Sequence, residues 1–119
     1  MNIEFLREHC IAKAGTTEGF PFGEDTLVFK VMGKMFALLS LDNPVSVNLK
    51  CDPEYAIELR EQHEEAIKPG WHMNKKHWNT VSLIDNLSDQ MILELIDHSY
   101  DCVVKTLKKA DREALKEMS

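Results

Sequence analysis

Residues 71–80 combine polar, basic and aromatic side chains with little periodicity, and they suggest chemistry more clearly than any other part of the 119-residue sequence. The centre of this stretch reads Asn74, Lys75, Lys76, His77 and Trp78. Adjacent lysines offer mobile positive charges to phosphates, an asparagine amide can donate to a phosphate or a base edge, and an aromatic ring can pack on a sugar or a base. The composition therefore favours a nucleic-acid contact loop, with a solvated loop as the alternative. For Trp78 itself we favour a packing role, because a large aromatic residue before a strand usually enters the core.

Three further lysines and an asparagine sit at positions from which they could add to the same positive surface. Lys30 and Lys34 flank a tight turn, so a hairpin built there could lay both ammonium groups along a phosphate backbone. The alternative is that they only protect a strand edge against aggregation. Lys50 precedes a helix start, and Asn48, one pleat away, could donate a hydrogen bond beside it. For Lys50 the alternative role is solubility.

The distribution of charge matters here more than its total. The net charge of −6 by itself argues against a nucleic-acid binder, because phosphate contacts need Lys and Arg. Between Glu65 and Asp85, however, the sequence has lysines and histidines but no acidic residue. Residues 52–65, in contrast, are dense in carboxylates and contain only one arginine. We therefore expect a polarised molecule with positive strands and loops and acidic helices, whose local field can outweigh the net charge.

Catalytic and metal-binding motifs are weak or absent in the sequence. The spacing of five between His72 and His77 fits no helical metal motif, and no third ligand lies nearby. The three cysteines, Cys10, Cys51 and Cys102, are far apart and form no Cys-x-x-Cys pair. No P-loop, nucleophile elbow or dinucleotide fingerprint is present. We predict no catalytic residue, no metal ligand and no cofactor.

The elements that must position these side chains follow from periodicity and capping. The expected elements are a helix at 2–14, an irregular edge strand at 16–25, and strands at 26–31, 35–41 and 45–50. A helix that begins at residue 52 and is ended by residues 68–70 should follow, then a strand at 80–84 and a helix from 88 to 107. Asn2, Asp52 and Ser88 are the predicted N-caps, and a turn is expected at residues 42–44. The short connections predict an antiparallel meander.

These elements predict one α+β domain spanning residues 1–119, with a charged tail at 108–119 that frays. Helices should cover one face of the antiparallel sheet and leave the other face available. No apolar run approaches the roughly 20 residues that span a bilayer, and the N-terminus lacks signal-peptide features. We therefore expect a cytoplasmic monomer without membrane contact.

Several motifs resemble the MmcQ/YjbR family over nearly the whole chain. They are NLKCDP at 48–53, GWHMNKKHWNT at 70–80, FPFG at 20–23, FKV at 29–31, KMFAL at 34–38 and DHSY at 97–100. The resemblance implies a CyaY-like (frataxin-like) α+β fold that binds DNA through a "double wing" of β-hairpins. The family is not known as an enzyme class, so the resemblance also implies that the protein is not an enzyme.

The residues and the resemblance together identify one candidate DNA-contact set. It comprises Lys30, Lys34, Asn48, Lys50, Asn74, Lys75, Lys76, His77 and Trp78. Two alternatives remain open. One is an adaptor domain whose acidic helix at 52–65 or open sheet face engages a basic protein partner. The other is an iron binder that uses the acidic helix of a frataxin-like fold.

Overall fold

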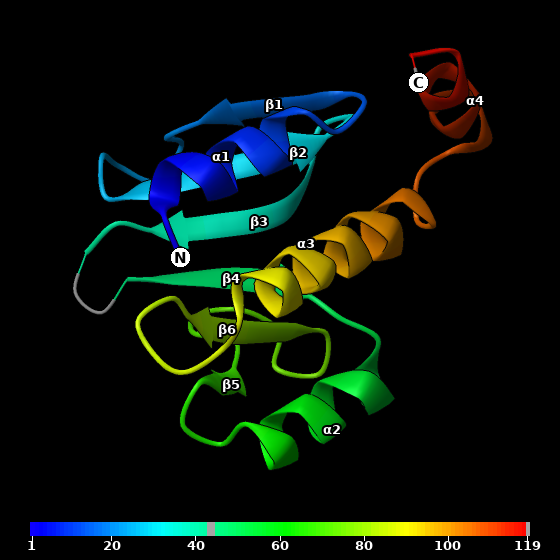
Figure 1. Cartoon of the computed structure of the whole chain (residues 1–119). Helices are drawn as coiled ribbons and strands as arrows, with labels where there is room; N and C mark the ends of the chain where they lie inside the picture. The colour runs from blue at the N-terminus through cyan, green and yellow to red at the C-terminus, as the bar shows by residue number, and fades with distance from the viewer. Residues whose placement is uncertain (43–44, 119) are drawn as a thin grey trace.

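The computed structural model describes residues 1–42 and 45–118, and in these residues four helices and six strands form one layered unit (Figure 1). In chain order they are α1 (Ile3–Ile11), β1 (Thr16–Gly19), β2 (Thr26–Val31), β3 (Lys34–Ser40), β4 (Ser46–Lys50), α2 (Pro53–Gln62), β5 (Ile67–Pro69), β6 (Trp78–Ser82), α3 (Asp89–Val104) and α4 (Lys109–Met118). The predicted α+β class is confirmed.

Local sequence explains where the first three helices begin. The side-chain oxygens of Asn2, Asp52 and Ser88 each accept a hydrogen bond from a backbone N–H in the first turn of α1, α2 and α3. These bonds satisfy amide groups that have no partner inside the helix. Pro53 follows its cap at a position where the missing N–H costs nothing. The three predicted N-caps are therefore confirmed.

The sheet has strand order β1-β2-β3-β4-β6-β5, and every pair of neighbours is antiparallel. Alternating direction places the end of β2, the start of β3, the end of β4 and the start of β6 at the same end of the sheet. The register pairs Val31 with Lys34 and Lys50 with Trp78, which fixes this alignment. Of the turn predicted at residues 42–44, Asn43 and Pro44 lie outside the described residues.

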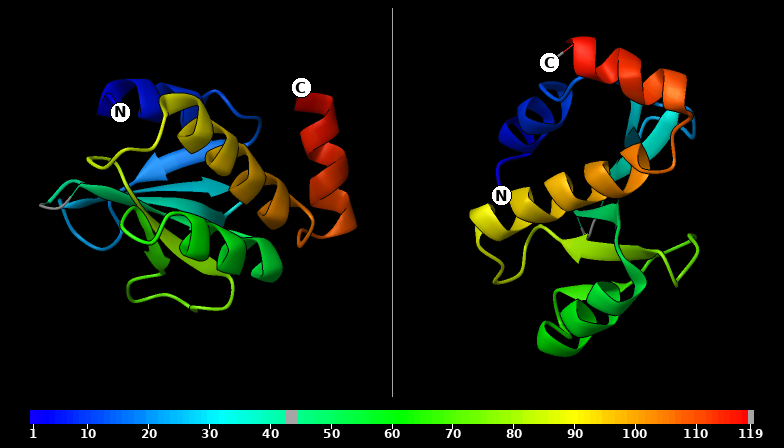
Figure 2. Two further views of the ribbon diagram at one scale, coloured as in Figure 1. Left: turned by 60° about the horizontal axis from the view of Figure 1, so that its bottom comes forward. Right: turned by 90° about the vertical axis from the view of Figure 1, so that its right-hand side faces the viewer.

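Helices α1 and α3 lie on one face of the sheet, and α2 packs at its β5 side (Figure 2). Leu27, Phe29 and Val31 alternate toward the helices and are buried in the main core. No described helix packs on the opposite face. A small second cluster of Val28, Leu38 and Trp78 covers part of that face. The sheet thus keeps one open face, as the sequence predicts.

Ser99 of α3 links the helix directly to the sheet. Its hydroxyl accepts a hydrogen bond from Lys50 N at 2.8 Å and donates one to Phe36 O at 2.5 Å. The regular pairing of β3 with β4 ends at Ala37 and Leu49, so the hydroxyl bridges the two strands where their own ladder stops. Ser99 is fully buried, so water cannot replace it.

The chain after α2 differs from the sequence prediction. Helix α2 ends at Gln62, and Ile67–Pro69 forms the edge strand β5 instead of the helix terminator expected at 68–70. Ile67 is 1 % exposed and pairs with Val81, so its burial draws this segment into the sheet. Pro69 is tolerated because an edge strand needs no second hydrogen-bonding partner.

The C-terminal segment also differs from its prediction. The sequence predicts a frayed tail at 108–119, whereas Lys109–Met118 forms helix α4. Leu115 is buried and lies over Gly15, where a Cβ would meet Leu115 Cδ2 at 2.4 Å. Gly15 has a φ of +69°, a conformation that favours glycine. The packing of Leu115 on Gly15 is therefore one contact that joins α4 to the body of the fold.

The longest helix in the described part of the chain is α3, with 16 residues. None of the helices formed by residues 1–42 and 45–118 combines the length and apolarity that crossing a membrane requires.

Candidate functional site

The antiparallel topology gathers most of the chain's 14 Lys and Arg residues at one end of the molecule (Figure 1). The β2–β3 turn, the end of β4, the β5–β6 loop (residues 70–77), the end of α3 and α4 all lie on that side. We call this the basic end and define it by Lys13, Lys30, Lys34, Lys50, Lys75, Lys76, Lys105, Lys108, Lys109, Arg112 and Lys116. The structure therefore brings every lysine of the predicted contact set to one end.

The opposite end of the sheet carries carboxylates. The connection between β1 and β2, the residues after β3 and the turn after β6 supply Glu24, Asp25, Asp42 and Asp85, all exposed. The sheet is therefore polarised from end to end, whereas α4 carries three cations and three carboxylates (Asp111, Glu113 and Glu117). The prediction that positive charge is confined to strands and loops is wrong, because α4 contributes Lys109, Arg112 and Lys116. The sequence signal for this was the cluster of basic residues after residue 104, which the prediction of a frayed tail left out of the candidate contact set.

The β2–β3 turn is fastened to the end of α3. Lys34 Nζ donates to Thr106 O at 3.0 Å and lies 3.3 Å from Thr106 Oγ1. Its ammonium still carries charge at the surface, but its position is fixed. Among the ion pairs of the described residues, none involves Lys30, Lys50 or Lys76. Those three cations are available to an external anion.

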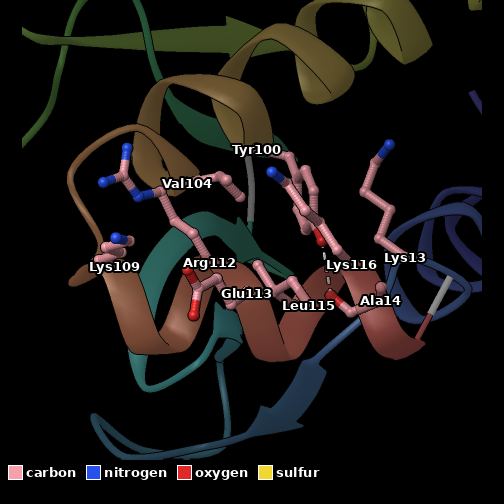
Figure 3. Close-up of a pocket in the computed structure, with 9 residues that line it drawn as sticks. All are labelled: Lys13, Ala14, Tyr100, Val104, Lys109, Arg112, Glu113, Leu115 and Lys116. Atoms are coloured by element: carbon pink, nitrogen blue, oxygen red, sulfur yellow. Dashed lines mark hydrogen bonds between the residues drawn. The ribbon is translucent and has the colours of Figure 1, made fainter.

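A cleft of about 690 Å³ separates α4 from α1 and α3 at the basic end (Figure 3). Its floor is apolar, and its lining residues are Lys13, Ala14, Tyr100, Val104, Lys109, Arg112, Glu113, Leu115 and Lys116. Lys13 Nζ lies 2.5 Å from Asp97 Oδ1 and 5.1 Å from the centre of the Tyr100 ring. Partial burial alone would raise the pKa of Asp97, but hydrogen bonds from Lys13 and His9 outweigh it and lower that pKa. The charge of Lys13 is therefore paired with Asp97 at the edge of the cleft.

Arg60 of α2 holds the β5–β6 loop in place. Its guanidinium donates from Nε to Asn79 Oδ1 at 2.6 Å, and from Nη2 to Trp78 O at 3.2 Å and to Lys75 O. A planar guanidinium with several fixed donors can join these acceptors at once. Lys75 Nζ in turn donates to Gly70 O at 2.9 Å, across the neck of the loop. These bonds hold the loop, and the Lys75 ammonium points back into it.

The remaining predicted loop residues divide into structural and exposed groups. Asn74 Oδ1 accepts from Lys76 N at 2.9 Å, and its carbonyl accepts from His77 N and Trp78 N, so Asn74 shapes the turn. Trp78 is 8 % exposed and packs against Val28 and Leu38, which confirms its predicted packing role. Its indole is not available for contact with a nucleic acid. Lys76 is exposed and His77 is half-buried, so solvent can reach both side chains.

A groove of about 840 Å³ crosses the open face of the sheet, next to this loop. Phe22, Thr26, Met35, Leu38, Ser40, Ser46, Asn48, Lys68, Pro69, Trp71, His72, Met73 and Thr80 line it. No carboxylate is among the described residues that line it, although the chain has 20 Asp and Glu. Its neutral hydroxyls and aromatic walls make it a different kind of surface from the basic end.

Trp71, at one wall of this groove, is 67 % exposed, yet its backbone is fixed to the sheet. Trp71 N donates to Thr80 Oγ1 at 2.8 Å, Thr80 Oγ1 donates to Asn48 Oδ1 at 2.5 Å, and Asn48 Nδ2 donates to Trp71 O at 3.2 Å. The three bonds form a closed ring. Asn48, predicted as a DNA contact, instead positions Trp71. The sequence prediction missed Trp71, although a tryptophan in a polar segment without periodicity was a signal.

The residues on either side of Trp71 are constrained, His72 by its backbone conformation and Gly70 by close packing. His72 has a φ of +58° and stands edge-on to the indole, with ring centres 4.6 Å apart. A left-handed conformation is costly for a non-glycine residue and concentrates at functional sites. At Gly70 a Cβ would lie 2.8 Å from Trp78 Cβ, so a larger residue cannot replace it without a shift. The strain and the close approach both fix the position of Trp71.

None of the three cysteines lines the groove. Cys10 and Cys51 are buried and Cys102 is half-buried, and all three are free. Burial raises the pKa of the Cys51 thiol to about 12, which keeps it protonated and poorly nucleophilic. His98 Nε2 accepts from Asp52 N at 3.2 Å and lies 3.5 Å from Cys102 Sγ. In the residues that the structure describes, no group of three or more His, Cys, Asp or Glu is placed to hold a metal ion.

A family model and several curated proteins match this chain over most of its length. The family model described as YjbR matches residues 11–102. The chain is 36 % identical over 116 residues to the Escherichia coli K12 protein named "Uncharacterized protein YjbR", covering 97 % of this chain and 98 % of that one. It is 41 % identical over 98 residues to the protein named "Uncharacterized protein YbdF" of Escherichia coli O157:H7, covering 82 % of this chain and 80 % of that one.

Two solved structures have the same fold. The crystal structure of Deinococcus radiodurans protein DR2400, with domain DUF419, superposes with a TM-score of 0.89 and 40 % identity, and covers 97 % of this chain and 88 % of that one. The crystal structure of a Pseudomonas syringae protein superposes with a TM-score of 0.73 and 29 % identity, and covers 86 % of this chain and 98 % of that one. Both likenesses extend over most of the sheet and its helices.

Proposed function

Because this chain belongs to the YjbR family, and its resemblance to that family implies DNA binding, we propose that it binds nucleic acid at the basic end, mainly through phosphates. The observation that carries the proposal is the end-to-end separation of charge in a chain of net charge −6. A sheet that collects lysines at one end and carboxylates at the other creates a local positive field. Such a field orients a polyanion toward one end of the molecule.

The shape of the basic end also supports the proposal. The β2–β3 turn and the β5–β6 loop project at the same end and flank β4, so they fit the expected double wing of hairpins. Lys30 and Lys76 supply one available cation from each wing, and Lys50 supplies one between them. Both wings are held in place, Lys34 being bonded to Thr106 and the loop to Arg60. Fixed wings bind with a small loss of conformational entropy.

The test is fluorescence anisotropy on a labelled DNA duplex at two salt concentrations. Three to six phosphate contacts should give log Kd a slope of about 0.9 per contact against log salt concentration. Lys30→Ala, Lys50→Ala and Lys76→Ala should each weaken binding and together reduce that slope by about three. Gln62→Glu is the matched control, because it changes the net charge equally on exposed α2, away from the wings.

Two results would contradict the proposal: no binding at low salt, or a triple variant that binds as tightly as the parent. In that case the acidic face of α2 becomes the candidate surface. Glu54, Glu58 and Glu61 are exposed on it, with Ile57 52 % exposed between them. That surface would suit a basic protein partner, and a pull-down performed with and without nuclease would separate the two cases.

A further inference from the structure

The groove on the open face has properties that phosphate binding at the basic end does not explain. Trp71 is 67 % exposed and Phe22 is 65 % exposed, so two large aromatic side chains leave apolar surface in water at one groove. Here the ring of hydrogen bonds through Thr80 and Asn48 holds the Trp71 backbone in that position. A preorganised aromatic surface costs little entropy when it binds a second ring. Trp71 is therefore built as a platform for a ligand.

The walls of the groove suit a flat, electron-rich ligand. Phe22 is 65 % exposed and lines the groove from the β1–β2 connection, while Trp71 lines it from the β5–β6 loop. The thioethers of Met35 and Met73 also line it, and sulfur makes favourable contacts with aromatic rings. The volume of about 840 Å³ lies within the range of small-molecule sites, roughly 300–1,000 Å³. A single planar base with its sugar can enter such a groove.

The floor of the groove can recognise polar edges without discriminating by charge. Thr26, Ser40 and Ser46 contribute hydroxyls, each of which can donate and accept a hydrogen bond. No hydrogen bond of these three side chains occurs among the described residues, so they are available to a ligand. Lys68 supplies a cation at the β5 side, and the described lining residues include no carboxylate that would repel a phosphate. This combination matches a nucleotide unit.

We propose that the groove binds an unstacked base of single-stranded nucleic acid, stacked on Trp71 with its edge toward the hydroxyls of the floor. The inference rests on the proposed function and names the substrate class of the same protein. In a duplex the base faces are hidden in the stack, so only a single strand or an extruded base can present one. The β5–β6 loop joins the two surfaces, because it carries both Trp71 and Lys76. A strand whose phosphates contact Lys76 at the basic end can thus reach Trp71 along the loop, and the hydroxyls of the floor lie farther along the sheet.

The experiment uses the fluorescence of Trp71 in the full chain. The chain has two tryptophans, and the other, Trp78, is 8 % exposed, so quenching by a ligand reports on Trp71. The probes are a single-stranded oligonucleotide, a duplex of the same sequence and an abasic single strand of the same length. We expect strong quenching and tightest binding with the single strand, and weak quenching with the other two.

Substitutions then test the stacking itself. Trp71→Ala should weaken single-strand binding by about 5- to 150-fold, which is the usual effect of losing one stacked base, and leave abasic-strand binding unchanged. Trp71→Phe should restore most of the affinity. The control is Phe5→Ala, which removes a comparably exposed aromatic (48 %) from α1 on the helix side of the sheet. Unchanged near-ultraviolet circular dichroism will show that the variants are folded.

The outcomes separate the two proposals. Equal binding of single strand, duplex and abasic strand, with Trp71→Ala as tight as the parent, overturns the stacking inference and leaves phosphate binding at the basic end intact. Binding of none of the three overturns both. Single-strand preference that survives Trp71→Ala also overturns the inference, because the preference would then arise at another surface.

Discussion

Replacing Ser99 by alanine tests whether one hydroxyl joins the helix layer to the sheet. The substitution removes the bonds to Lys50 N at 2.8 Å and to Phe36 O at 2.5 Å and changes little else in volume. Both backbone groups would remain without a partner, because Ser99 is 0 % exposed and admits no water. An unsatisfied buried group costs about 1–3 kcal/mol. We expect Ser99→Ala to lower the free energy of unfolding by about 2–4 kcal/mol, a large share of the roughly 5–15 kcal/mol of a typical domain.

Urea denaturation followed by circular dichroism measures this loss. With a slope of about 2 kcal/mol per molar urea, the midpoint should fall by about 1–2 M while the slope stays the same. Ser82→Ala is the matched control, because Ser82 Oγ accepts a 3.3 Å bond from Ile84 N at an exposed site. It should cost less than about 0.5 kcal/mol. A similarly small effect for Ser99→Ala would refute the reasoning that the hydroxyl replaces the missing rungs between β3 and β4.

Further predictions concern α4, Trp71 and pH. Leu115→Ala should release α4 without unfolding the sheet, seen as faster tryptic cleavage after residue 108 or 109 with the remainder intact; an unchanged cleavage rate would show that other contacts hold the helix. Gly15→Ala should destabilise the fold by about 1–3 kcal/mol in thermal melts, because it adds strain at φ +69° and a clash with Leu115. Asn48→Ala should open the hydrogen-bond ring and increase the mobility of Trp71 in time-resolved anisotropy, whereas Asn86→Ala, at an exposed turn, should not. The pKa of Asp97 is lowered in the folded state, so Asp97 stabilises the fold above its ordinary pKa of 3.8, and this stability is lost as the pH falls through the folded pKa. The urea midpoint of the parent should therefore drop more steeply below about pH 4 than that of Asp97→Asn. Parallel pH profiles of the two would exclude this contribution.

The basic end and the groove depend on different physical features of the same fold. The basic end exists because antiparallel strands return their turns to common ends, so it depends on topology and tolerates movement of single side chains. The groove depends on exact placement of one ring, which Arg60, Asn48 and Thr80 secure. Single lysine substitutions should therefore have graded effects on binding, whereas loss of Trp71 should have a sharp one.

Much of the architecture was determined by the sequence alone. Alternation at residues 26–31 set the buried face of β2, and Asn2, Asp52 and Ser88 set three helix starts. These features depend on neighbours a few positions apart, and local periodicity records them directly. The sequence also predicted the packing of Trp78. It predicted that the hairpin lysines share one surface, because short connections leave few topologies open.

Other features were decided only by tertiary structure. Ile67 belongs to the sheet because it pairs with Val81, and Ser82 N donates a hydrogen bond to the neighbouring Ala66 O. Helix α4 is held in place by Leu115, which packs on Gly15, one hundred residues earlier in the chain. Asn48 became the support of Trp71 because a loop 23 residues away folded back over its strand. Each of these depends on partners that are distant in sequence and adjacent in space. Local pattern carries no record of such contacts, so the platform at Trp71 is visible only once the sheet has assembled.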